Sequence, residues 1–230
     1  MTDILLIRHG ETAWNAVRRL QGHLDIPLNE EGLRQARALG AALKNEKLDA
    51  VISSDLQRAQ QTAAAITVHQ NLPLHTDAGL RERCYGGFEG ELYSEIQQKY
   101  PQAYAEWKSL DPDARFPAGK HTAETLREFH QRVISHIIRY AQQFKGGKIA
   151  LVAHGGVLEC AYREAHALPL QTPRAVTIYN ASINRFVLRD DRLQMLSWGD
   201  ISHLEAPDVL DEIALPDNSS TIVATATTGQ

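Results

Sequence analysis

Apolar residues are arranged along the chain in two alternating patterns. Short continuous apolar runs occupy residues 4–7, 50–53 and 149–153, each bounded by charged or glycine-containing segments. Between the first and second runs, and again after the second, apolar side chains recur every three or four residues, over 29–43 and 55–66. The continuous runs predict buried strands, and the three-to-four spacing predicts amphipathic helices. Because such strands and helices alternate in α/β proteins, we expect a mostly parallel sheet covered on both faces.

The segment from about residue 86 to 121 breaks this rhythm. It mixes aromatic with polar residues and contains the helix breakers Pro101, Pro112 and Pro117. We interpret it as a mostly helical insertion over one end of the sheet, whose small core is formed by Tyr93, Tyr100, Tyr104 and Trp107. Residues 1–215 then form a single domain. Residues 216–230 are rich in Ser, Thr and Ala without periodicity, and we expect them to be disordered.

Regular patterns return after the insertion. A long helix is predicted from about Ala123 to Phe144, with Thr122 as its N-terminal cap. A second helix is predicted over roughly 157–166. The runs 182–188 and 194–198 flank the turn Arg189-Asp190-Asp191 and predict a β-hairpin.

Charge and cysteine usage narrow the function classes. The formal net charge of -4 argues against binding to nucleic acids or anionic membranes, but a local pocket could still bind a small anion. Cys84 and Cys160 match no metal-ligand spacing and no disulfide framework, which suits a reducing compartment. No stretch approaches the roughly 20 apolar residues of a membrane span, and the first apolar run is too short for a signal peptide. A cytoplasmic location is the default expectation.

Two of the predicted strands end in a histidine followed by glycine. The first ends in Arg8-His9-Gly10 and the second in Ala153-His154-Gly155. One His-Gly pair is a weak signal, because a histidine at a strand end is more often structural. Ligands of open parallel sheets bind at the carboxyl ends of the strands, so two such pairs predict that both imidazoles project into one crevice.

Two arginines and one carboxylate complete a candidate phosphate site. Arg8 adjoins His9, and Arg58 lies just past the second strand, at the start of a helix. Arginine binds phosphate through planar bidentate hydrogen bonds, and a helix N-terminus adds a positive dipole. Glu82, in Leu80-Arg81-Glu82-Arg83, is the candidate general acid, because like-charge repulsion from a bound phosphate would raise its pKa.

Together these residues match a known family. The chain resembles the histidine phosphatase superfamily, also called phosphoglycerate mutase-like, over roughly residues 3–206. The matching segments are Leu6–Thr12 with Trp14-Asn15 and Gln21-Gly22, Ser53–Ala59 with Thr62-Ala63, Leu80–Glu82 with Gly86–Gly90, Val152–Gly156, and Gly199–Leu204. The Arg-His-Gly-Glu-Thr block is the most specific of them.

The resemblance implies a role for each candidate residue. His9 would be the nucleophile that becomes phosphorylated, while Arg8, Arg58 and His154 would contact the phosphoryl group. Glu82 would protonate the leaving group and then activate water. The positions that match the rest of the phosphate pocket are Asn15, Gln21, Gly22 and Gly155. The family also implies a three-layer α/β sandwich of phosphoglycerate mutase-like fold, with the helical insertion over the active site.

No cofactor and no metal ion are expected. The family implies none, and the other histidines show no paired ligand spacing. The expected partner is a small phosphorylated metabolite, and an exposed sheet edge or hairpin would allow a homodimer.

Two other functions remain open. A cofactor-dependent phosphoglycerate mutase would use the same residues together with 2,3-bisphosphoglycerate. Dedicated mutases carry paired arginines for the substrate carboxylate in a longer insertion, whereas the matching stretch 105–109 has only Lys108 as a basic residue, which favours a phosphatase. A non-catalytic phosphate-binding relative is disfavoured because all five candidate residues are retained. Many relatives carry Gly-Glu-Ser where this chain has Ala123-Glu124-Thr125, so we assign no binding role to Glu124.

Overall fold

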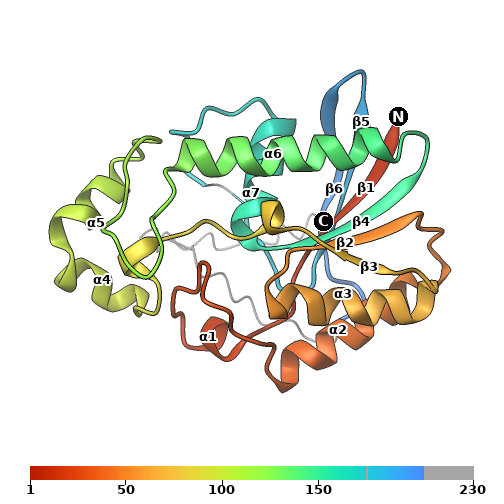
Figure 1. The fold of residues 1–230 in the computed structure, drawn as a ribbon, viewed down its shortest axis with the longest axis horizontal. Helices are drawn as coiled ribbons and strands as arrows, with labels where there is room; N and C mark the ends of the chain where they lie inside the picture. Colours follow the sequence, from red (N-terminus) through yellow and green to blue (C-terminus); the bar gives the residue numbers. More distant parts are fainter. Residues whose placement is uncertain (175, 205–230) are drawn as a thin grey trace, which may run out of the picture.

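Six strands form one sheet in the order β3-β2-β4-β1-β5-β6 (Figure 1). The computed structural model describes residues 1–174 and 176–204. Its strands are β1 (Thr2–Arg8), β2 (Ala50–Ser53), β3 (Leu74–Thr76), β4 (Lys148–Ala153), β5 (Ile183–Arg189) and β6 (Arg192–Asp200). The pairs β1–β4, β4–β2 and β2–β3 are parallel, whereas β5 runs antiparallel to both β1 and β6. The predicted mostly parallel α/β sheet is confirmed.

Helices cover both faces of this sheet. The α-helices are α1 (Ala13–Ala16), α2 (Glu30–Ala42), α3 (Gln57–Gln70), α4 (Tyr93–Lys99), α5 (Pro101–Lys108), α6 (Leu126–Gln143) and α7 (Gly155–Ala165), and three short 3₁₀ helices are η1 (Leu43–Asn45), η2 (Ala78–Leu80) and η3 (Gly86–Phe88). Alternate side chains of a strand point to opposite faces. Ile4 and Leu6 of β1 therefore pack toward α6 and α7, and Leu5 and Ile7 pack toward α2 and α3.

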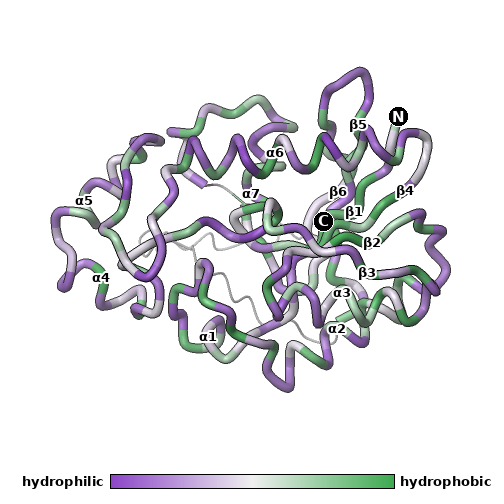
Figure 2. Tube along the Cα trace, in the orientation of Figure 1, coloured by the Kyte–Doolittle hydropathy of each residue, from purple (hydrophilic) through white to green (hydrophobic). Residues whose placement is uncertain are grey.

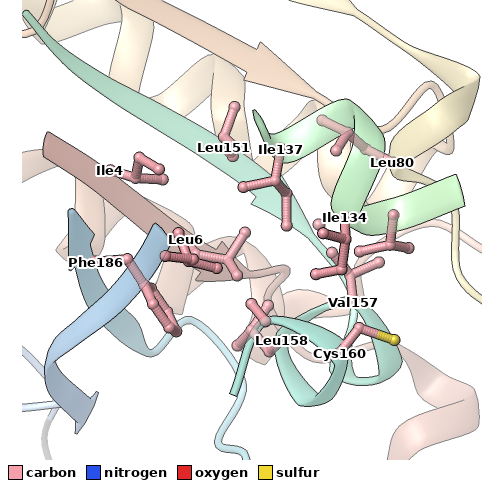
Figure 3. Packing of buried hydrophobic residues seen from close by; sticks show 14 of the residues in the cluster. Ile4, Leu6, Leu80, Ile134, Ile137, Leu151, Val157, Leu158, Cys160 and Phe186 are labelled. Atoms are coloured by element: carbon pink, nitrogen blue, oxygen red, sulfur yellow. The ribbon is translucent and has the colours of Figure 1, made fainter. Parts of the chain in front are cut away.

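The α6–α7 face holds the larger apolar cluster. Figure 3 shows Ile4, Leu6 and Leu151 of the strands facing Ile137 of α6 and Leu158 of α7. Hydropathy along the trace follows the same layering, because the apolar stretches are concentrated on the central strands (Figure 2). Burial on both faces explains why β1, β2 and β4 are continuous apolar runs in the sequence.

Helix starts agree with the sequence except in one case. The helix predicted from residue 29 is α2, and Asn29 caps it, because its Oδ1 accepts from the N–H of Gly32 at 2.7 Å. The predicted cap Thr122 of the long helix is wrong. α6 begins at Leu126, and Thr125 caps it in a capping box with Glu128. Residues 122–125 are not helical, because the N–H of Glu124 donates to the carbonyl of Cys84 at 2.9 Å, which delays the first helical turn.

The hairpin prediction is confirmed, and one strand escaped prediction. β5 and β6 are joined at Asp190 and Asp191, which both adopt left-handed backbone conformations, with φ of 50° and 57°. β3 was not predicted, because it has three residues and two of them are exposed and polar.

Residues 86–121 contain η3, α4 and α5 and have an apolar cluster of their own. Phe88 and Phe116 stack at its centre, with ring centroids 4.8 Å apart. The predicted aromatic core is present, since Tyr93 is buried in this cluster and Trp107 packs against it together with Tyr100 and Tyr104. Residues 216–230, predicted to be disordered, lie outside the described residues. No helix in the described part of the chain has the length and apolar composition needed to cross a membrane.

Candidate active site

The two histidines predicted to meet lie side by side at the centre of the sheet. His9 follows β1 and His154 follows β4, and these strands are parallel neighbours with Arg8 paired to Ala153. The two imidazole centroids are 5.1 Å apart, with the ring planes inclined by 60°. Both side chains are almost completely buried, at 2% and 0% exposure. Strand adjacency in the sheet therefore brings together two residues that are 145 positions apart in the sequence.

The surroundings of His9 keep its imidazole neutral. Its Nδ1 lies 2.6 Å from the carbonyl oxygen of Gly10, which can only accept, so Nδ1 carries the proton and Nε2 has the free lone pair. Burial lowers the pKa of His9 well below its usual value, and the positive charges of Arg58 and Arg8 lower it further. A neutral imidazole with an unprotonated Nε2 is the form that can attack phosphorus.

Arg58 determines the tautomer of His154. The Nε–H of Arg58 donates to Nδ1 of His154 at 3.2 Å, so the proton of the neutral ring lies on Nε2. That Nε2 is buried and has no hydrogen-bond partner among the described residues. Burial lowers the pKa of His154 well below its usual value, and the positive charge of Arg58, the second largest cause, lowers it further. His154 therefore presents a neutral donor, suited to a phosphoryl oxygen.

Both arginines are held rigidly by backbone carbonyls. Arg58 donates from Nη1 to Leu24 at 2.9 Å and from Nη2 to Gly22 at 2.8 Å. Arg8 donates from Nη1 to the carbonyl of Ile178 at 2.6 Å. Gly22 thus anchors Arg58 through its carbonyl, in a left-handed conformation where a Cβ would come within 2.1 Å of Glu89 Oε1. Predicted as a phosphate-lining residue, Gly22 is observed here as a support for the arginine.

Asn15 and Gln21 are buried and linked through one hydroxyl. Thr12 Oγ1 lies 2.9 Å from Asn15 Oδ1 and 3.0 Å from Gln21 Oε1. Asn15 also accepts from the N–H of Thr12 at 2.9 Å in the capping box of α1. The structure assigns both residues a part in shaping the loop after β1, and their contact with phosphate stays a prediction.

Glu82 lies beside the N-terminus of α7. Its Oε1 accepts from the N–H of Arg83 at 2.7 Å, and its Oε2 accepts from the N–H of Gly156 at 2.9 Å. Burial raises the pKa of Glu82 and outweighs these hydrogen bonds and the nearby arginines, which lower it. The raised pKa of Glu82 was expected from repulsion by a bound phosphate, whereas in the structure burial of the carboxyl group raises it. A Cβ at Gly156 would collide with Glu82 Oε1, so a larger residue there would displace the Glu82 carboxylate. At Gly155 a Cβ would meet only Arg8 Nε, at an ordinary 3.6 Å.

Several supporting residues received no role from the sequence. Thr62 Oγ1 accepts from the N–H of Gly10 at 3.0 Å and donates to the carbonyl of Arg58 at 2.8 Å, tying the two loops together. Asn180 Nδ2 donates to the carbonyl of His9 at 3.0 Å. Thr62 could have been found from its position one helical turn after Arg58. Asn180 offered no local signal, since it reaches His9 only through the pairing of β5 with β1.

A cavity lies next to Arg83 and Gly156, the two residues whose N–H groups donate to the Glu82 carboxylate. It reaches Gly156 and Arg83 and is lined further by aromatic residues of the 86–121 segment and by α6, α7 and the loop after α7. The lining residues are Arg83, Tyr85, Trp107, Leu110, Asp111, Ala114, Phe116, Leu126, Phe129, Gly156, Glu159, Cys160, Arg163, Leu170 and Arg174. The guanidinium of Arg83 lies 4.4 Å over the Phe116 ring, and Nε donates to the carbonyl of Glu124. Arg83 thus brings a positive charge to the cavity next to Glu82.

Metal-ligand geometry is absent from the described ranges. Within residues 1–174 and 176–204, no group of three His, Cys, Asp or Glu side chains is arranged to hold a metal ion. The positive charge at the site comes from Arg8 and Arg58.

Comparison with known proteins identifies several relatives. The profile of the histidine phosphatase superfamily (branch 1) matches residues 4–201. Phosphoglycerate mutase-like protein 4 of Arabidopsis thaliana is 39% identical over 206 residues, which cover 88% of this chain and 87% of the relative. The metal-independent phosphoserine phosphatase of Arabidopsis thaliana is 38% identical over 208 residues, covering 90% and 84%. The solved structure of phosphoserine phosphatase from Entamoeba histolytica in complex with 3-phosphoglyceric acid aligns with a TM-score of 0.78 and 25% identity, covering 89% of this chain and all of that one.

Proposed function

The chain belongs to the histidine phosphatase superfamily (branch 1), and on that premise we propose that it is a metal-independent phosphatase of small phosphomonoesters that works through a phosphohistidine at His9. The family resemblance and the fold class inferred from the sequence are confirmed by the comparisons. One observation supports the mechanism above all others: two buried imidazoles, whose hydrogen bonds favour opposite neutral tautomers, lie 5.1 Å apart, and the buried arginines Arg8 and Arg58 are near. One ring can attack phosphorus while the other donates to its oxygens.

In the first half-reaction, the Nε2 lone pair of His9 attacks phosphorus. The bond from phosphorus to the ester oxygen breaks, and protonated Glu82 transfers its proton to that leaving oxygen. Arg8, Arg58 and the Nε2–H of His154 stabilise the negative charge on the non-bridging oxygens. The products are phospho-His9, a free alcohol and the Glu82 carboxylate.

In the second half-reaction, the Glu82 carboxylate takes a proton from water. The water oxygen attacks phosphorus, the bond to Nε2 breaks, and inorganic phosphate leaves. His9 returns to its neutral state and Glu82 to its protonated one, so protons and electrons balance over the cycle.

Metal independence is supported by the source of the charge. A divalent cation would stabilise the transferring phosphoryl group electrostatically, and a pair of arginines with fixed geometry can supply the same stabilisation. The Arabidopsis relative that is 38% identical is named a metal-independent phosphoserine phosphatase.

We further propose that the leaving group lies in the cavity beside Glu82. Aromatic walls at Tyr85, Trp107 and Phe116 suit an organic body, and Arg83 suits a second anionic group such as a carboxylate. This favours small phosphomonoesters that also carry a carboxylate, of the phosphoserine or phosphoglycerate type.

A mutase is the second candidate, because the relative that is 39% identical is named phosphoglycerate mutase-like. A mutase returns the phosphoryl group to the substrate and requires 2,3-bisphosphoglycerate as its cofactor. In stretch 105–109 the basic residue is Lys108, which is exposed and does not line the cavity. We therefore favour hydrolysis.

A substrate panel tests the proposal. Phosphoserine, 3-phosphoglycerate, a sugar phosphate and p-nitrophenyl phosphate would be assayed for phosphate release, and 3-phosphoglycerate also for isomerisation with and without 2,3-bisphosphoglycerate. We expect phosphate release to dominate. Isomerisation faster than release would establish the mutase, and no turnover of any ester would refute an enzyme of this class.

A further inference from the structure

The side chain of Arg132, on α6, donates all of its N–H groups to two partners: the backbone of residues 79–82 and the carboxylate of Glu124. Arginine has five N–H donors in a fixed planar fork. In this chain Nε and Nη2 donate to the two carboxylate oxygens of Glu124, each at 2.7 Å. Nη1 donates to the carbonyls of Gly79 and Arg81 at 2.9 and 3.0 Å, and Nη2 also donates to the carbonyl of Glu82 at 3.2 Å. One guanidinium therefore holds three backbone carbonyls of residues 79–82, the segment that ends in Glu82, the proposed general acid.

Glu124 ties the same segment from its other side. Its Oε2 accepts from the N–H of Cys84 at 3.0 Å, while its backbone N–H donates to the Cys84 carbonyl at 2.9 Å. The Arg83 side chain donates from Nε to the Glu124 carbonyl at 3.0 Å. The carboxylate thus orients the Arg132 fork and fixes the residues directly after Glu82.

The segment has no regular structure that could hold it instead. η2 ends at Leu80 and η3 begins at Gly86, and the residues between them belong to no helix or strand. Within residues 1–174 and 176–204, the hydrogen bonds to the Glu82 carboxylate come from two backbone N–H groups, of which one belongs to the neighbouring Arg83. Where Glu82 lies relative to His9 therefore depends on how its backbone is fixed.

We propose that the Arg132–Glu124 pair is the positioning element of the general acid, and that it acts on protonation of the leaving group through Glu82. The inference rests on the proposed function. Arg132 donates to Glu124 and to the carbonyls of residues 79, 81 and 82, whereas Arg8 and Arg58 donate to the carbonyls of Ile178, Leu24 and Gly22. The pair therefore holds the segment of the acid and not the arginines of the phosphoryl site. A displacement of about 1 Å in a catalytic group can cost on the order of 100-fold in rate.

The leaving group provides the decisive readout. An alkyl phosphate expels a strongly basic alkoxide that needs the Glu82 proton, whereas p-nitrophenyl phosphate expels a stable anion that needs it little. The value of kcat/KM reports the steps up to leaving-group departure and excludes the later hydrolysis of phospho-His9. We expect R132M to lower kcat/KM on the order of 100-fold for the best alkyl phosphate and by about threefold or less for p-nitrophenyl phosphate. R132K should fall between wild type and R132M, because an ammonium has three donors and no planar fork.

Two comparisons separate positioning from general destabilisation. R127M removes another arginine of α6, which is 56% exposed and pairs with Asp113 on the surface, and it should leave both substrates at wild-type values. The double variant E82Q/R132M should be no slower on the alkyl phosphate than E82Q alone, because the acid that Arg132 positions is already lost. If R132M does not fold, E124Q is measured in its place, since it keeps the side-chain size and weakens the fork. It should show the same preference for p-nitrophenyl phosphate to a smaller degree.

Equal losses on both substrates, or fully multiplicative effects in the double variant, would overturn the positioning role. A wild-type protein that hydrolyses neither ester would refute the proposed function, which is a separate outcome.

Discussion

The phosphoryl site and the cavity beside it are built in different ways. Arg8, His9, Arg58 and His154 are at most 2% exposed. Arg8, His9 and Arg58 are hydrogen-bonded to backbone carbonyls, and His154 accepts from Arg58. In the 86–121 segment, by contrast, α5 has no fully buried residue and its aromatics are partly exposed around a small cluster. Dense packing tolerates little displacement, whereas a small satellite core can accept other side chains at modest cost. The candidate reacting groups thus lie around the sheet, whereas the cavity proposed for the leaving group is lined in part by the segment that covers it.

The largest effect tests the sheet side of this comparison. H9A removes the attacking Nε2, so we expect kcat to fall by roughly 10⁴-fold or more, with loss of an acid-labile phosphoenzyme. Radiolabelled substrate and rapid quenching measure the intermediate. H75A is the matched control, because His75 is exposed on β3 and should label like wild type. Undiminished labelling of H9A would place the nucleophile elsewhere.

The next effect concerns the acid and its pH dependence. The first half-reaction needs neutral His9 and protonated Glu82, and at the ordinary pKa values of 6.5 and 4.5 no pH favours both forms. The lowered pKa of His9 and the raised pKa of Glu82 increase the fraction of enzyme that holds both forms at once, so kcat/KM should follow a bell-shaped pH profile. It falls below the His9 pKa as the ring gains a proton, and above the Glu82 pKa as the acid loses one.

E82Q should lower kcat/KM for alkyl phosphates by about 10²–10⁴-fold and abolish the alkaline limb of the profile. Its NH₂ group would face one of the backbone N–H groups that Glu82 accepts from, so thermal unfolding is recorded alongside. An unchanged alkaline limb would assign that ionisation to another group.

A smaller effect is expected on the cavity side. R83M removes the charge proposed to bind a carboxylate, and a hydrogen bond between charged groups contributes about 1.5–3 kcal/mol. We expect KM for phosphoserine or 3-phosphoglycerate to rise by at least about 10-fold, with little change for p-nitrophenyl phosphate, which has no carboxylate. Similar increases in KM for substrates with and without a carboxylate would show that Arg83 supports the site as a whole and does not select the leaving group.

The smallest effect should come from chelation. With excess EDTA, turnover of p-nitrophenyl phosphate should stay within about twofold of the untreated rate, because arginines supply the charge that a metal ion would otherwise provide. Loss of activity that a divalent cation restores would contradict the metal-free mechanism.

Much of the candidate site could be predicted because the sequence shows where the buried strands end. Apolar runs locate β1 and β4, and a histidine directly after each must lie at the same edge of a parallel sheet. Residues that act through long-range contacts were missed. Arg132 looks like one more polar residue on an amphipathic helix, and its five contacts lie 8 to 53 positions away. The cap of α6 was misplaced by three residues for a similar reason, since pairing of Glu124 with Cys84 delays the helix.

By itself, the sequence predicted every described strand of the sheet except β3, the family and the candidate reacting side chains, because these depend on residue type and on periodicity along the chain. Only the tertiary structure decided the protonation states. The tautomers of His9 and His154 follow from Gly10 and Arg58, and the raised pKa of Glu82 follows from its burial. A proton's position depends on which partners and how much water surround a group, and for His154 the deciding partner lies 96 residues away.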